Sequence, residues 1–157
     1  MRIRRANPAD TSSVRQLEQR SDTASHWSAA QYDALFEFGA QARLVLVAID
    51  ESAEPLLQGC LVARCLPEEW EIENVIVAKQ HRGCGVGASL VQQLLADART
   101  AGVSSVILEV RESNLPALRL YESIGFKPEG RRSNYYQHPI EDAVLYRILL
   151  QTCDKIP

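Results

Sequence analysis

Three glycines spaced two residues apart, Gly83, Gly85 and Gly87, mark the segment of this chain with the clearest chemical meaning. They follow a β-branched stretch and precede an amphipathic one, which predicts a strand, a glycine-rich loop and a helix in succession. Such a loop directs several backbone N–H groups toward a ligand at the helix N-terminus, where the helix dipole also attracts anions. Glycine lets the ligand approach the backbone closely. We therefore predict a cradle for a pyrophosphate group.

Two common pyrophosphate-binding motifs do not fit this loop. A dinucleotide-binding domain carries its glycines as G-x-G-x-x-G after the first strand, whereas several expected strands precede them here. A nucleoside triphosphate loop ends in Gly-Lys-Ser or Gly-Lys-Thr, but Gly87 is followed by Ala88 and Ser89. The loop instead fits the pattern Arg/Gln-x-x-Gly-x-Gly/Ala in two registers, which start at Arg82 and at Gln80.

The elements that position this loop begin with two expected helices. A strand at residues 3–5 leads to a turn at 7–10, which caps a helix with an apolar face. A second helix is expected from Ser28, because Gln31 occupies the capping-box position.

Most of the remaining chain has the pattern of strands joined by short turns. The expected strands are residues 43–49, 56–66, 70–77, 106–110, 126–136 and 143–150. Two further helices are expected, one at 85–101 closed by Gly102 and one capped by Asn114 and ended by Gly125. We predict an α/β (α+β) fold with a mixed, mostly antiparallel sheet of about seven strands and helices on both faces.

Composition narrows the function classes. A chain of 157 residues suits a single domain, here 1–157, and a net charge of −3 argues against broad binding to nucleic acid. The four cysteines lack metal or redox spacing, so we expect free thiols and no metal. The N-terminus lacks a signal-peptide pattern, and no apolar run reaches the length of a membrane span. We expect a cytoplasmic protein with neither nucleic acid nor membrane as partner.

The loop in the Arg82 register resembles that of the GNAT superfamily of acetyl-coenzyme A-dependent N-acetyltransferases. Residues 108–114 and 120–126 are similar to a second signature of that superfamily. A narrower similarity, to the bacterial ribosomal-protein-alanine N-acetyltransferases of the RimI type, lies in residues 27–28, 109–111, 114, 121–123, 131–136 and 141–143. The resemblance implies a GNAT-like fold and acetyl-CoA as cosubstrate.

The resemblance also implies how the coenzyme is held. The loop amides would bind its pyrophosphate, the strand at 75–77 its pantetheine arm, and Asn114 would contact that arm. The implied coenzyme-binding residues are Val75, Ile76, Val77, Arg82, Gly83, Cys84, Gly85, Val86, Gly87 and Asn114. Backbone N–H groups near Ile76 and Val77 would polarise the thioester carbonyl.

By the same analogy, Glu109 is the general base, acting through water, and Tyr121 is the general acid. Glu73, on the strand before the loop, is a competing base. Each assignment has a structural alternative, because Glu109 in an apolar strand needs a cation such as Arg111, and Tyr121 has the helical spacing of a core residue. The implied substrate-binding residues are Trp27, Glu73, Tyr135 and Tyr136.

The resulting hypothesis is an enzyme that acetylates the N-terminal α-amine of a protein, such as an N-terminal alanine of a ribosomal protein. We expect a monomer or weak dimer. A GNAT enzyme of small amines or amino acids and a non-catalytic coenzyme A-binding module remain alternatives. The sequence leaves open the acceptor, the oligomeric state, the choice between Glu109 and Glu73, and any redox role of Cys84.

Overall fold

The computed structural model describes residues 1–21, 27–36, 42–52 and 56–151. The chain divides into two compact units, one formed by Met1–Cys65 with Glu73–Leu94 and the other by Leu66–Ile72 with the described residues from Leu95 onward. Strand β4 (Glu69–Val77) and helix α3 (Val86–Ala101) run through both units.

The first unit begins with strand and helix elements whose ends are set by local capping. Its elements before β4 are β1 (Arg2–Arg5), η1 (Pro8–Asp10), α1 (Thr11–Gln19), α2 (Ala29–Asp33), η2 (Ala34–Phe36), β2 (Arg43–Asp50) and β3 (Leu56–Cys65). The side chain of Ser28 accepts a hydrogen bond from Gln31 N–H at 3.2 Å, and the Gln31 side chain accepts one from Ser28 N–H at 2.7 Å. This reciprocal box confirms the predicted start of the second helix.

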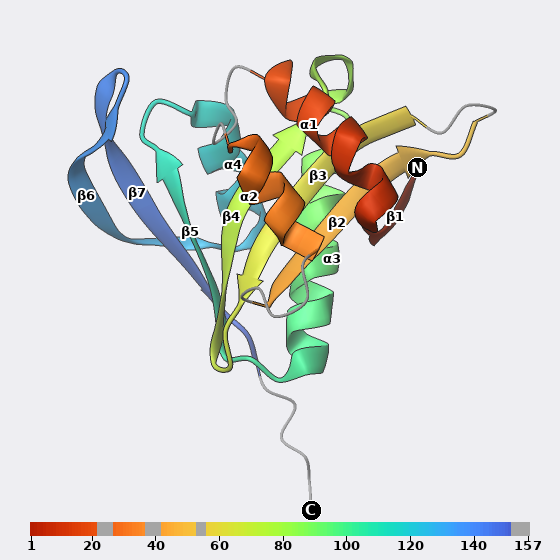
Figure 1. Cartoon of the computed structure of the whole chain (residues 1–157). Helices are drawn as coiled ribbons and strands as arrows, with labels where there is room; N and C mark the ends of the chain where they lie inside the picture. The colour runs from red at the N-terminus through yellow and green to blue at the C-terminus, as the bar shows by residue number, and fades with distance from the viewer. Residues whose placement is uncertain (22–26, 37–41, 53–55, 152–157) are drawn as a thin grey trace, which may run out of the picture. The chain divides into compact units, whose positions relative to one another are not determined.

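The core of the first unit lies between its strands and helices α1 and α2. Strands β1, β2 and β3 pair antiparallel, and α1 and α2 cover one face of β2 and β3 (Figure 1). The cluster of buried residues that joins them is Val14, Leu17, Tyr32, Leu35, Val45, Val47, Cys60, Val62, Ile76 and Ala78. Burial of this apolar surface is what holds the short helices on the sheet.

The opposite face of β3 approaches α3 closely. A Cβ atom built on Gly59 would lie 2.9 Å from the Ile76 carbonyl oxygen and 2.9 Å from Val86 Cγ1, with Leu90 at 3.1 Å. Only a glycine fits this spacing without a shift of the neighbours. Because Val86 is the first residue of α3, the contact fixes the start of that helix against the strand.

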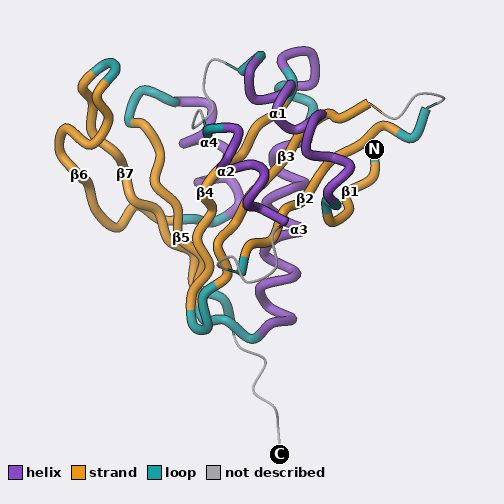
Figure 2. The backbone as a smooth tube through the Cα atoms, in the orientation of Figure 1, coloured by secondary structure: helices purple, strands orange, loops and turns teal. Residues whose placement is uncertain are grey.

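The second unit is a strand-rich layer completed by one helix. The short helix η3 (Lys79–His81), which precedes α3, belongs to the first unit. The elements of the second unit that follow α3 are β5 (Ser105–Arg111), α4 (Leu115–Ile124), β6 (Lys127–Gln137) and β7 (Ile140–Leu149). Residues Glu69–Ile72 of β4 pair in parallel with Ser105–Leu108, and β7 pairs antiparallel with both β5 and β6. Figure 2 shows β6 and β7 as a long hairpin.

Helix α4 has the predicted boundaries. The Asn114 side chain accepts a hydrogen bond from Ala117 N–H at 3.3 Å, and Gly125 ends the helix with a left-handed φ of 111°. One predicted boundary was wrong, because β7 begins at Ile140 instead of residue 143. The turn between β6 and β7 contains just His138 and Pro139, so pairing resumes three residues earlier than the apolar pattern indicates.

The strand order is β1-β2-β3-β4-β5-β7-β6 in a seven-stranded sheet. The antiparallel pairs and the parallel β4–β5 pair confirm the predicted mixed, mostly antiparallel sheet. A single domain over residues 1–157 stays a prediction. Among the described helices, none has the length and apolar character needed to cross a membrane.

Candidate functional site

The glycine loop lies between β4 and α3, in the predicted order of strand, loop and helix. Gly83 and Gly85 have φ values of 74° and 82°, a region that residues with a Cβ enter only with strain. A Cβ at either position would meet no atom within 4 Å. The backbone conformation therefore favours glycine at both positions, and the space beside them is open. Gly87 instead lies within α3.

The start of α3 offers backbone donors beside that space. Ser89 N–H donates to the Gly85 carbonyl at 3.0 Å and opens the helical ladder. The N–H groups of Val86, Gly87 and Ala88 precede it, in the turn where helix donors have no intrahelical acceptor. With the dipole of a 16-residue helix behind them, these groups suit a pyrophosphate. The residues present thus fit the phosphate-bearing part of acetyl-CoA.

Arg82 ties the loop to the end of α1. Its Nε donates to the Val77 carbonyl at 3.2 Å, and its Nη2 donates to Ser21 Oγ at 3.3 Å. Ser21 is buried, whereas Arg82 and Cys84 are exposed. A cavity of about 320 Å³ lies beside this contact and is lined by Ser21, Val77 and Lys79 among others.

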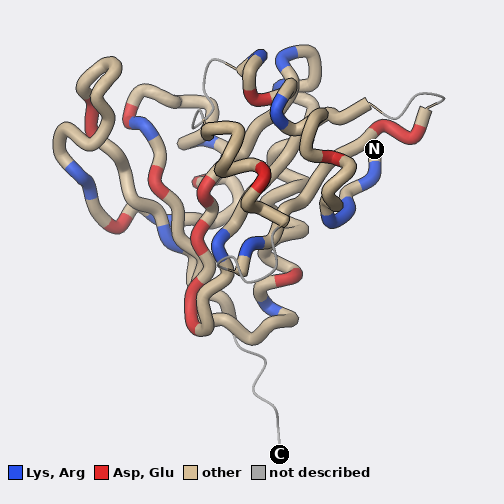
Figure 3. The backbone as a smooth tube through the Cα atoms, viewed as in Figure 1, with Lys and Arg blue, Asp and Glu red and all other residues tan. Residues whose placement is uncertain are grey.

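Glu73, the competing base, is already paired in the first unit. Arg43 Nε and Nη2 donate to its two carboxylate oxygens at 2.6 and 3.0 Å. The Arg43 guanidinium also lies 5.7 Å from the centroid of the Trp27 ring. Glu73 belongs to the row of acidic residues along β4 (Figure 3), and its side chain is 16% exposed. Both oxygens of this carboxylate are therefore committed to one arginine.

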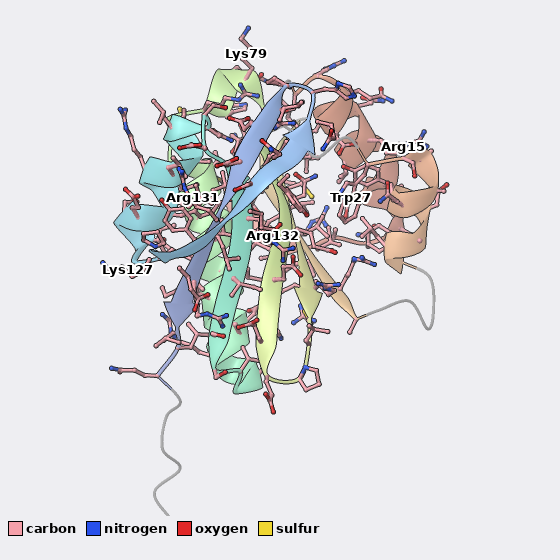
Figure 4. All side chains as sticks on the ribbon, turned by 90° about the vertical axis from the view of Figure 1, so that its left-hand side faces the viewer. Arg15, Trp27, Lys79, Lys127, Arg131 and Arg132 are labelled. Atoms are coloured by element: carbon pink, nitrogen blue, oxygen red, sulfur yellow. The ribbon has the colours of Figure 1, made fainter. Side chains whose placement is uncertain are left out.

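A buried polar group beside Trp27 was missed by the sequence analysis. Glu18 on α1 is 4% exposed, and its carboxylate accepts a hydrogen bond from Trp27 N–H at 2.9 Å. Burial and the neighbouring Glu18 raise the pKa of the Tyr32 phenol, whose ring lies 5.6 Å from that of Trp27. Trp27 is thereby held beside α1 and α2 (Figure 4). Glu18 lies four residues after Val14 in α1, and this spacing places both on the buried face of the helix.

Glu109, the predicted base, lies on β5 in the second unit. Its carboxylate pairs with Arg132 Nε at 2.6 Å, and its side chain is 16% exposed. The cation is not Arg111, which pairs with Glu141 at 3.0 Å. Tyr135 also faces this carboxylate, since burial and hydrogen bonding to Glu109 raise the pKa of the Tyr135 phenol.

Tyr121 and Asn114 belong to α4 in the same unit. Tyr121 is 6% exposed, and its ring meets that of Phe126 edge to face at 5.7 Å. Burial and the nearby Tyr136 raise the pKa of the Tyr121 phenol, so it remains protonated well above neutral pH. The Asn114 carboxamide oxygen caps α4, so this residue has a structural role besides the predicted coenzyme contact.

Two adjacent tyrosines line the β6 side of this group. The rings of Tyr135 and Tyr136 are 5.1 Å apart and nearly perpendicular. The Arg111 guanidinium lies 4.1 Å from the Tyr136 ring centroid, and that of Arg132 lies 5.6 Å from the Tyr135 centroid. Tyr135 is 48% exposed, which leaves an aromatic face available to a ligand.

The predicted residues therefore fall into two groups. The first unit contains the glycine loop, Glu73 and Trp27, and the second contains Glu109, Asn114, Tyr121, Tyr135 and Tyr136. The arginine partners Arg43 and Arg132 were not predicted, because each is far along the chain from the carboxylate that it holds. Within the described residues, no group of three or more His, Cys, Asp or Glu side chains is arranged to hold a metal.

Comparisons with known proteins bear on the fold and on the enzyme class. The acetyltransferase (GNAT) family matches residues 11–126. The ribosomal protein bS18-alanine N-acetyltransferase of Salmonella typhimurium is 32% identical over 132 residues, which cover 83% of this chain and 84% of that protein. Several further relatives match over about half of their own length.

Solved structures share the whole fold. The crystal structure of the ribosomal-protein-S18-alanine N-acetyltransferase from Escherichia coli has a TM-score of 0.81 at 24% identity, covering 99% of this chain and 97% of that one. Arabidopsis thaliana NAA60 in complex with acetyl-CoA has a TM-score of 0.85 at 18% identity, covering 95% and 98%. The predicted fold and the predicted enzyme class are confirmed. The chain belongs to the GNAT family of acetyltransferases.

Proposed function

We propose that this acetyltransferase modifies the N-terminal α-amine of a protein, with an N-terminal alanine of a ribosomal protein as the first candidate. The observation that carries the proposal is the similarity to a bS18-alanine N-acetyltransferase over 83% of the chain. The exposed ring of Tyr135 beside Glu109 supports it, because an aromatic face beside a carboxylate suits a peptide that begins with an ammonium group.

The coenzyme would be held mainly by backbone groups. The N–H groups at the start of α3 and the loop of Gly83 and Gly85 suit the pyrophosphate, and residues 75–77 suit the pantetheine arm. Acetyl-CoA, when bound, supplies the acetyl group as a thioester. The donors themselves belong to a fixed helix terminus, which favours the anion without a cationic side chain.

The chemistry of the acceptor favours an α-amine. At pH 7, deprotonating an α-amine with a pKa near 7.7–8.0 costs about 1–1.4 kcal/mol, whereas a lysine near 10.4 costs about 4.6 kcal/mol. Glu109 takes the proton of the acceptor through water, and the buried phenol of Tyr121 donates a proton to the leaving thiolate. Glu73 is the weaker candidate for the base, because both of its oxygens accept from Arg43.

A comparison of acceptor classes tests the proposal. Acetylation of a hexapeptide that begins with alanine is measured beside a panel of polyamines and free amino acids, with acetyl-CoA as donor. We expect the peptide to react with the highest kcat/KM. A preference for the small amines would overturn the peptide assignment and favour a small-molecule acetyltransferase.

A single substitution tests the placement of the pyrophosphate. Arg82→Glu puts a negative charge at the loop and removes the contacts to Val77 and Ser21. We expect coenzyme A to bind about tenfold or more weakly by calorimetry, because the new carboxylate repels the pyrophosphate and the loop loses its two contacts. The matched control is Arg15→Glu on α1. Unchanged coenzyme binding in Arg82→Glu would contradict the assigned loop.

A further inference from the structure

The Glu109 carboxylate has a counter-ion that is far more exposed than the carboxylate itself. Glu109 lies on β5, one residue beyond the ladder with β4 and opposite Leu145 of β7, and its side chain is 16% exposed. Arg132 lies on β6 at the end of the strand order, and its side chain is 61% exposed. The pairing register of β6 shifts between Arg132 and Tyr136. The carboxylate is therefore the sheltered partner of the pair, and the guanidinium is the exposed one.

The ion pair is close, yet it is not deeply buried. Arg132 Nε lies 2.6 Å from Glu109 Oε1. A carboxylate this sheltered needs a cation or strong donors to remain charged. A pair with one largely exposed partner gains little net stability, because water screens it and the long side chain loses rotamer freedom. An incoming cation can thus replace the guanidinium at low cost.

We infer that Arg132 is a specificity-determining residue that occupies Glu109 until the acceptor ammonium displaces it, and then binds the first carbonyl groups of the acceptor. The inference rests on the proposed function, since it takes Glu109 as the base beside which the acceptor amine binds and to which its proton passes through water. The displaced guanidinium can stack on the Tyr135 ring, whose centroid is already 5.6 Å from Arg132 in the paired state.

This exchange selects a class of acceptor. A guanidinium released from Glu109 carries five donors and no acceptor. A peptide N-terminus presents a carbonyl oxygen next to its ammonium group, whereas a polyamine presents further cations, which the guanidinium repels. Arg132 therefore favours peptides over polyamines through both an attraction and a repulsion.

The other charged groups around Glu109 do not replace Arg132 in this role. From β6, Tyr135 and Tyr136 both sense the charge of Glu109. From β4, Glu71 acts on the same Tyr135 phenol, so it adds negative charge. Leu145 of β7, which pairs with Glu109, is apolar. Arg111 also acts on Tyr136, but it pairs with Glu141 at 3.0 Å, so Arg132 supplies the positive charge at Glu109.

Arg131 is the matched control, since it is the adjacent arginine on the same strand (both are labelled in Figure 4). It pairs with Glu112 and, at 3.9 Å, with Asp142. Successive residues of a strand point to opposite faces. Removal of Arg131 thus changes the charge of β6 equally without touching Glu109.

The first test measures discrimination between acceptors. The ratio of kcat/KM for an alanine-starting hexapeptide to that for spermidine is compared in the wild type, Arg132→Ala, Arg132→Lys and Arg131→Ala. We expect the ratio to fall about tenfold or more in Arg132→Ala, as for one lost charge-assisted hydrogen bond. Arg132→Lys should give an intermediate ratio and Arg131→Ala the wild-type one. An equal ratio in Arg132→Ala and Arg131→Ala would overturn the inference.

A second test needs no turnover. The Nε–H resonance of Arg132 is followed by NMR in arginine-labelled protein and is identified by its loss in Arg132→Lys. Adding the hexapeptide with coenzyme A should move this resonance away from its ion-paired position. A peptide that binds without moving it would refute the exchange while leaving the proposed function intact. A wild type that neither binds nor acetylates any peptide would refute the proposed function itself.

Discussion

Two carboxylates, Glu73 and Glu109, are held by arginines in different ways. Arg43 donates to both oxygens of Glu73 and its side chain is 23% exposed, whereas Arg132, whose Nε lies 2.6 Å from Glu109 Oε1, has a side chain that is 61% exposed and more open to replacement by water. A general base needs an oxygen available for the proton that it accepts. At the residue scale, this difference favours Glu109.

We expect Glu109→Gln to lower kcat by about 10²–10⁴-fold, the range for loss of a general base. Binding of acetyl-CoA, measured by calorimetry, should stay within about twofold, since the amide is isosteric. The matched change is Glu73→Gln, for which we expect a fall in kcat of less than about tenfold. A larger loss in Glu73→Gln than in Glu109→Gln would assign the base to Glu73.

Burial of Tyr121 predicts how the enzyme responds to alkaline pH. Its phenol has a raised pKa, so the protonated form that donates a proton persists as pH rises through 10. We therefore expect kcat to show no loss between pH 8 and 10 from this group. Tyr121→Phe should lower kcat about 10²-fold, because the donor is gone while the ring contact with Phe126 remains.

Tyr146 provides the control for Tyr121. It is also buried, its pKa is raised to about 12, and its hydroxyl donates to Glu122 at 2.7 Å. Tyr146→Phe removes a hydroxyl of the same kind without removing the proposed acid. Its kcat should stay within about twofold of the wild type. Similar losses in the two variants would show that Tyr121 acts by supporting the fold.

At the element scale, Gly59 links β3 to the start of α3. We expect Gly59→Ala to lower the free energy of unfolding by about 1–3 kcal/mol, because the added methyl group overlaps the Ile76 carbonyl and Val86. Coenzyme binding should weaken as well, since Val86 opens the helix whose N–H groups form the cradle. Urea denaturation and calorimetry measure the two effects. Gly130→Ala, at a position with no atom within 4 Å, should change neither.

The boundaries of several elements could be predicted because their signals are local. The Ser28–Gln31 box, the Asn114 cap and the positive φ of Gly125 each depend on residues within four positions of one another. The start of β7 was wrong for a related reason, since a two-residue turn extends pairing beyond the apolar residues that define the strand in sequence. The loop was found from its glycines alone.

At the scale of the whole molecule, the Arg4–Asp10 pair predicts part of the response to acid. The Arg4 guanidinium bonds both oxygens of Asp10 at 2.8 Å and holds the pKa of that carboxyl below its usual range. A lowered folded pKa means that the contribution is present above the unfolded value of about 3.9 and is lost as pH falls through the folded pKa.

Asp10→Asn should therefore destabilise the protein by about 1 kcal/mol at pH 7, and the difference should shrink as pH falls below the unfolded pKa of about 3.9. Urea denaturation at pH 7 and at acid pH measures it. Glu51→Gln is the control, because the Arg2–Glu51 pair is 3.4 Å apart with both side chains more than half exposed. A difference for Asp10→Asn that is equally large at both pH values would assign the effect to packing.

The ion pairs of the candidate site could not be predicted from the sequence. Glu73 and Arg43 are 30 residues apart, and Glu109 and Arg132 are 23 apart, so neither pair leaves a local pattern. The apolar surroundings of Glu109 in the sequence predict a cation beside it, with Arg111 as the example two residues away, but they do not identify Arg132. Pairing with Arg132 instead depends on the order β5-β7-β6 and on the register shift in β6. Charge partners of this kind follow from tertiary structure.

Strand β6 ends the sheet, so its outer row of backbone groups is open to pairing with another chain. Many residues of β6 resist such pairing, namely Lys127, Pro128, Glu129, Arg131 and Arg132. Proline removes a donor from the edge, and the charged side chains disfavour the stacking of two copies. The hairpin that faces the proposed acceptor can thus remain uncovered at high protein concentration. Resistance to edge-to-edge aggregation is a second consequence of the same arginines.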